Sequence, residues 1–147
     1  MPVFRAWINP LKCPEAELMP AGSPMPTAEQ LLDYHLADAR ARIPGPAGEH
    51  AVSLLQRGTL SVKLSLPVVP NQQTPHAQDE VYVIVCGRGV LIHDGKRDQF
   101  ESGDLLFVAA GIEHRFQDFT DDLAVWVVFF GPQGGDLPPE GQAALQA

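Results

Sequence analysis

Apolar and polar residues alternate along much of the chain after residue 50, in short segments that end at glycine or proline. The clearest case is residues 59–66, where every second position is apolar. Its apolar positions are Leu60, Val62, Leu64 and Leu66, and the polar positions between them are Ser61, Lys63 and Ser65. Because successive side chains of a strand point to opposite faces, this segment predicts a strand with one face in a core. We expect Lys63, on the polar face, to be solvated.

The same pattern predicts seven or more short strands with turn signals between them. The segments are residues 50–56, 59–66, 80–86, 90–93, 96–100, 105–109, 113–118 and 123–130. Asp94-Gly95 is a strong hairpin signal, and Gly103-Asp104 marks a further turn. Helical patterns do not interrupt these segments, so we predict an all-β, antiparallel sandwich or barrel over residues 50–131.

The first 49 residues follow a different pattern and form a predicted N-terminal extension. Residues 3–8 are suited to a short strand, and a proline-punctuated stretch follows them. Residues 28–41 have apolar positions at helical spacing, with Thr27 as the N-cap and Gln30 completing a capping box. The extension therefore predicts one helix, which we expect to pack on the outside of the barrel.

Composition and charge place the chain among ordinary globular proteins and exclude one class of partner. Hydrophobic residues make up 45% of the 147 residues, the net charge is -8 and the pI is about 4.9. Such a surface repels a phosphate backbone, so we exclude nucleic-acid binding. The longest apolar run, residues 123–130, is too short to span a bilayer, and no basic segment precedes an apolar one at the N-terminus. We expect a cytoplasmic protein with a loose tail at residues 132–147.

Two predicted strands carry side chains that bind divalent metals. His76 and Glu80 are four positions apart, and Glu80 opens an apolar strand. If the chain is extended there, His76, Glu80 and Tyr82 point to the same face. His114 lies on a separate strand, which the fold must bring near. Two imidazoles and one carboxylate compose the facial triad of non-heme iron sites, but these side chains also have structural roles, so spacing alone leaves both interpretations open.

The residues around His76 and Glu80 resemble the first of two sequence motifs of the cupin superfamily. That motif is His-x-His, three or four residues, Glu, six residues and Gly. His76, Glu80 and Gly87 match it in register, whereas Thr74 stands where the first His is expected.

The residues around His114 resemble the second cupin motif, which is Gly, five residues, Pro-x-Gly, two residues, His, three residues and Asn. Gly103, Gly111 and His114 match it in register, while Ala109 replaces the proline and Asp118 the asparagine. The two motifs occur in order with 15 residues between them, which is more specific than either motif alone.

The resemblance covers roughly residues 50–130 and implies a small double-stranded β-helix, or jelly-roll, barrel. By position it implies that His76, Glu80 and His114 bind one divalent metal ion, which could be Fe, Mn, Ni or Zn. Thr74 leaves three alternatives for the fourth ligand. Waters complete the coordination, an amide oxygen of Gln72 or Gln73 supplies it, or the site has lost its metal.

The functional hypothesis from this resemblance is a metal-dependent oxidoreductase of the dioxygenase type that acts on a small organic substrate. An isomerase or lyase is a weaker alternative, and a non-catalytic module that binds a small ligand or a metal is the alternative from another class. Tyr82 is the candidate catalytic residue, and Tyr82, Ile84 and Phe116 are expected to line an apolar pocket. His35, His50 and His93 have no motif context, so we interpret them as structural or surface residues.

Sheet edges must be covered in a soluble barrel, so we also predict a homodimer. The predicted strands at residues 3–8 and 123–130 are the segments expected to pair between subunits.

Overall fold

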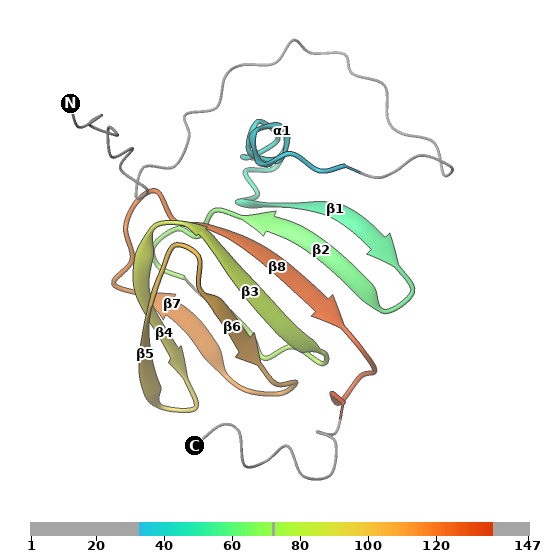
Figure 1. Cartoon of the computed structure of the whole chain (residues 1–147), viewed down its shortest axis with the longest axis vertical. Helices are drawn as coiled ribbons and strands as arrows, with labels where there is room; N and C mark the ends of the chain where they lie inside the picture. The colour runs from blue at the N-terminus through green and yellow to red at the C-terminus, as the bar shows by residue number, and fades with distance from the viewer. Residues whose placement is uncertain (1–32, 72, 137–147) are drawn as a thin grey trace, which may run out of the picture.

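The structure is a computed structural model, and it describes residues 33–71 and 73–136. In this part of the chain, eight strands form two antiparallel sheets that face each other, with one short helix outside them (Figure 1). The elements are α1 (Leu36–Arg40), β1 (Ala51–Arg57), β2 (Leu60–Ser65), β3 (Asp79–Cys86), β4 (Arg88–His93), β5 (Lys96–Glu101), β6 (Leu105–Val108), β7 (His114–Gln117) and β8 (Ala124–Phe130). The predicted all-β fold, an antiparallel jelly-roll barrel with one helix, is confirmed.

The core lies between the two sheets. The larger sheet has the strand order β1-β2-β8-β3-β6, and the smaller has the order β5-β4-β7. Buried side chains from both sheets form one cluster, which consists of Tyr82, Ile84, Leu91, Phe100, Val108, Phe116, Leu123, Val125 and Val127. Burial of these apolar side chains is the main favourable contribution to the stability of the barrel.

The register of the central strands decides which side chains face this core. On one row of the larger sheet, Tyr82 of β3 lies opposite Val127 of β8, which lies opposite Lys63 of β2. On another row, Glu80 lies opposite Phe129. Directly opposite residues in antiparallel strands point to the same face. Lys63 therefore shares the inner face with the buried Tyr82, and it is half-buried rather than fully solvated.

Every predicted strand within the described residues is present, and its ends differ from the prediction by at most two residues. The predicted strand at residues 3–8 lies outside the described residues. The agreement follows from short-range signals, because period-two alternation and glycine turns are properties of adjacent residues.

The helix is shorter than the sequence predicts. Within the described part of the predicted 28–41 helix, residues 33–35 are not helical and α1 begins only at Leu36. The reason is that His35 is extended, with φ -81 and ψ 137, and no side chain caps the helix there. The predicted capping box of Thr27 and Gln30 lies outside the described residues. No helix in residues 33–71 and 73–136 has the length and apolar character needed to cross a membrane.

Strand β8 lies in the interior of the larger sheet, hydrogen-bonded to β2 on one side and to β3 on the other (Figure 1). The expectation that residues 123–130 pair between subunits is therefore wrong, because both edges of this strand are already occupied. The edge strands of the larger sheet are β1 and β6.

Candidate metal centre

Three side chains chosen from the sequence meet on the inner face of the barrel. His76 lies in the loop before β3, Glu80 lies in β3, and His114 begins β7. One ligand atom from each lies within 4.8 Å of the others. A backbone hydrogen bond joins the two motifs, because the amide of Gly111 donates to the carbonyl of His76 at 2.8 Å. Segments that are far apart in sequence are thereby held side by side.

A second buried carboxylate fixes the loops around this cluster. Asp79 is 4% exposed, and its Oδ1 accepts a hydrogen bond from the amide of Ala110 at 2.9 Å. Its Oδ2 accepts another from the amide of Asp136, also at 2.9 Å. Asp79 therefore ties the start of β3 to the loop before β7 and to the segment after β8. Sequence reasoning missed this residue, since a carboxylate at a strand end gives no sign of its partners.

Glu80 is a buried carboxylate with an oxygen that has no hydrogen-bond partner among the described residues. It is 2% exposed, and its Oε2 has no hydrogen-bond partner within the described residues. That oxygen lies 3.0 Å from Nε2 of His114 and 3.7 Å from Nε2 of His76. Burial of a carboxylate without a partner is unfavourable, so a positive charge at this point would be stabilising.

The orientation of His114 also favours a positive charge next to Glu80. Its Nδ1 lies 2.8 Å from the carbonyl of Ile112, which can only accept, so Nδ1 carries a proton. In the neutral imidazole, Nε2 is then an unprotonated acceptor that faces Oε2 of Glu80. Two acceptors at 3.0 Å repel each other unless a proton or a metal ion lies between them. This is the arrangement in which a histidine is ready to bind a metal.

The pKa values of the two histidines move in opposite directions. Burial opposes protonation of His114, but the Glu80 carboxylate, 3.0 Å from its Nε2, and the hydrogen bond to the Ile112 carbonyl raise its pKa overall. Burial lowers the pKa of His76, with Glu80 opposing this effect and His114 and Lys63 adding to it. Of the two histidines, His114 therefore holds a proton more readily than His76 does.

Tyr82 lies beside the cluster as a hydrogen-bonding neighbour. It is 1% exposed, and its hydroxyl lies 2.8 Å from Nε2 of His114 and donates to Oε1 of Gln73 at 3.0 Å. Burial, followed by the charge of Glu80, raises the pKa of Tyr82 far above its ordinary value. Tyr82 therefore stays a protonated phenol, which suits a hydrogen-bond donor rather than a base.

The donor set fits a divalent metal, because two imidazole nitrogens and one carboxylate oxygen suit Fe, Mn, Ni or Zn. The structure also bears on the fourth ligand. Thr74 is exposed, and Gln72 lies outside the described residues. Oε1 of Gln73 already accepts from Tyr82, and its Nε2 donates to Asn71 at 3.0 Å. Within the described residues, the cluster of histidine and acidic side chains that could hold an ion therefore consists of His76, Glu80 and His114.

A pocket of about 460 Å³ lies against the cluster, and His76, Glu80 and Tyr82 are part of its wall. The remaining wall is partly apolar, from Pro67, Val68, Pro70, Phe116, Val127 and Phe129, and partly polar, from Glu49, His50, Lys63, Ser65, Asn71 and Gln73, with Ala51. Of the residues expected to line it, Tyr82 and Phe116 do so, whereas Ile84 belongs to the core. Sequence reasoning missed Lys63 and Phe129 as pocket residues, and His50, interpreted as structural or surface, lines it too.

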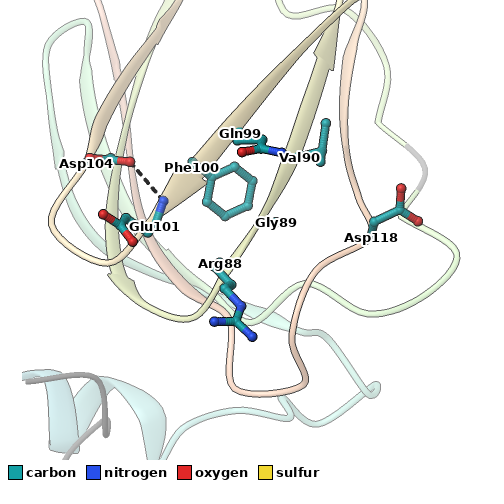
Figure 2. Close-up of a pocket in the computed structure, with 8 residues that line it drawn as sticks. All are labelled: Arg88, Gly89, Val90, Gln99, Phe100, Glu101, Asp104 and Asp118. Carbon is teal, nitrogen blue, oxygen red and sulfur yellow. Dashed lines mark hydrogen bonds between the residues drawn. The ribbon is translucent and has the colours of Figure 1, made fainter. Parts of the chain in front are cut away.

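A second hollow, of about 500 Å³, lies elsewhere and has no comparable chemistry (Figure 2). Its lining includes Glu101, Asp104 and Asp118, and Figure 2 shows Asp118 on the opposite side from the other two. Asp104 accepts from the amide of Glu101 at 2.8 Å, and Asp118 pairs with Arg97 at 3.0 Å. Two of its three carboxylates are thus engaged with neighbours, and the cluster that could hold a metal lies at the other pocket.

Comparisons with known proteins agree with the fold. Residues 67–130 match the family model of the cupin domain. Over 63 residues the chain is 41% identical to an uncharacterized protein of Streptomyces coelicolor, a match that covers 43% of this chain and 60% of that protein. The chain therefore spans less than two thirds of the length of this curated relative.

Two solved structures are similar in fold. A Cupin 2 conserved barrel domain protein from Salinispora arenicola has a TM-score of 0.52 and 20% identity, and the match covers 76% of this chain and 91% of that chain. KdgF from Halomonas sp. has a TM-score of 0.50 and 14% identity, and the match covers 56% of this chain and 78% of that chain. At these identities the two structures show the fold alone.

The raised pKa of His114 predicts how metal affinity depends on pH. An ion at the cluster competes with a proton on His114 more than with one on His76, whose pKa is lowered by burial. We expect the affinity for Zn(II) to rise about tenfold per pH unit below the His114 pKa and to level off above it. Calorimetry in buffers of different ionisation enthalpy should count about one proton released per ion. An affinity that does not change between about pH 5 and 8 would contradict this assignment.

Proposed function

The chain belongs to the cupin superfamily, and we propose that its barrel holds one divalent metal ion and acts as a metal-dependent enzyme on a small organic molecule. The proposed ligands are His76, Glu80 and His114. One observation supports this most strongly: the buried Oε2 of Glu80 has no hydrogen-bond partner in the described residues and lies near two imidazole nitrogens. A cation there would remove the cost of an unpaired buried carboxylate.

A metal bound at this point would polarise an oxygen of the substrate, and a redox-active metal such as iron would also activate O2. The residues of the chain have separate tasks. The three ligands hold the ion, and Tyr82 presents a phenol hydrogen to the neighbouring side chains. The pocket of about 460 Å³ binds the substrate and limits the access of water.

Within this proposal we favour a dioxygenase-type oxidoreductase over an isomerase or lyase. The ligand composition of two histidines and one carboxylate supports this, as does the position of His76 and Glu80 in the pocket wall. The alternative is a binding module without turnover. It is favoured by the exposed Thr74 at the place of a motif histidine and by the contacts of the Tyr82 hydroxyl with Gln73 and His114.

Metal content tests the proposed ligands directly. After loading with Fe(II) or Mn(II), elemental analysis should find about one ion per chain in the wild type and much less in His114→Ala and Glu80→Gln, because each change removes a ligand. The control is His35→Ala, since the His35 side chain is 68% exposed and lies outside the cluster. A wild-type protein that retains no Fe(II), Mn(II) or Zn(II) would refute the metal site.

Turnover separates the enzyme from the binding module. We expect the iron-loaded protein to consume O2 with at least one compound from a panel of small aromatic and carbonyl compounds. Tyr82→Phe should keep the metal and lower kcat by about tenfold or more, because it loses the phenol donor and little volume. Full metal occupancy with saturable binding but without O2 uptake or product would favour the binding module.

We also propose a homodimer. Leu105 and Phe107 on the edge strand β6 are 64% and 52% exposed, and such a surface tends to be covered by a partner. Light scattering on the full chain should give about twice 15.9 kDa, and Leu105→Glu with Phe107→Glu should halve it. Val69→Glu is the control, because Val69 is 80% exposed in a loop. A wild-type mass near 15.9 kDa would contradict the dimer.

A further inference from the structure

Lys63 places a positive charge in the wall of the pocket beside the metal cluster. The residue pairs with Val127, and Val127 pairs with Tyr82, so its side chain leaves β2 on the inner face. It is half-buried and lines the same pocket as His76 and Glu80. A lysine that only kept the protein soluble would be expected on the outside of the barrel.

Phe129 holds this ammonium group close to the cluster. Nζ of Lys63 lies 5.3 Å from the centroid of the Phe129 ring, within the range of a cation–π contact. The same ring meets the imidazole of His76 edge-on, with centroids 4.8 Å apart. The aromatic ring therefore lies against both the lysine and a proposed ligand, and it restricts where the ammonium group can lie.

The charges around Lys63 leave it available to a ligand. Within the described residues, no carboxylate lies at ion-pair distance from its ammonium group, and Lys63 is the single lysine or arginine among the pocket residues. Of the two glutamates in the wall, Glu80 belongs to the metal cluster. Glu49, the other, is exposed and accepts a hydrogen bond from the amide of Ala47 at 2.9 Å. A half-buried cation without a counter-ion favours an anionic ligand.

The rest of the pocket limits the size and charge of that ligand. A volume of about 460 Å³ suits a small molecule, and one ammonium group suits one carboxylate better than a phosphate, which usually meets several donors. Phe116, Val127 and Phe129 offer apolar contact for a carbon skeleton. The net charge of -8 repels anions at long range, so the attraction must be local to Lys63.

We propose that the substrate or ligand of this pocket is a small organic carboxylate, and that Lys63 determines this specificity by pairing with the carboxylate group. The remainder of the molecule then lies against the aromatic wall of the pocket that also contains His76 and Glu80. This inference rests on the proposed function for its reaction, but the recognition of the carboxylate depends on Lys63 alone.

Benzoate and benzamide are matched probes, because they share a ring and differ in charge. By calorimetry, wild-type protein should bind benzoate about tenfold or more tightly than benzamide, both when metal-free and when loaded with Zn(II). Lys63→Gln should bind the two equally and keep its zinc, whereas Lys63→Arg should retain most of the preference. The control is Lys96→Gln, since Lys96 is exposed on β5 and lies outside the pocket.

The outcomes separate the two proposals. A preference for benzoate that survives in Lys63→Gln, or that is absent from the metal-free wild type, would overturn the role of Lys63 whatever the metal does. A protein that never retains zinc but prefers benzoate through Lys63 would overturn the metal enzyme and leave carboxylate recognition intact. A preference seen only with zinc, and equal in Lys63→Gln, would assign the carboxylate to the metal and refute this proposal.

Discussion

The burial of one carboxylate is the constraint on which the centre of this molecule depends. Glu80 is 2% exposed and lies on β3, which is hydrogen-bonded on both sides. Because the strand cannot rotate the side chain out to water, the surrounding groups must compensate its charge. Two imidazoles approach it, and His114, whose Nδ1 is bonded to the Ile112 carbonyl, turns its Nε2 toward it. The requirement for a positive charge is therefore built into the pairing of the strands.

Much of the fold was predictable from the sequence, because strands and turns are encoded by neighbouring residues. The position of Lys63 shows where such reasoning stops. Alternation separates Lys63 from Leu64 but does not say which face of β2 is inside, since the pattern is the same for both choices. In the fold, α1 contacts β2 from outside the sheet (Figure 1). Leu64 is 0% exposed, and Lys63 lines the pocket on the inner face. The helix was overpredicted for a similar reason, since spacing could not reveal the extended His35.

The candidate site also has residues that the sequence predicts and residues that it does not. His76, Glu80 and His114 could be chosen from two motifs, because the spacing within each motif reflects a local backbone conformation. The hydrogen-bond partners of Tyr82 and Asp79 could not be predicted from the sequence. They come from loops whose paths depend on the whole barrel. The role of Thr74 was open in the sequence, and in the structure this residue is exposed, whereas Glu80 and His114 are buried.

The two histidines of the cluster differ in their access to solvent. The side chain of His114 is 1% exposed, whereas that of His76 is 31% exposed and lies in a loop. An ion held between them would meet solvent on the His76 side, so it would enter and leave the barrel past that imidazole while His114 and Glu80 stayed in place. The order in which bonds to the ion break would then be fixed by the architecture, with the loop ligand released first. Exchange with a chelator would accordingly be a local event that leaves the paired strands closed.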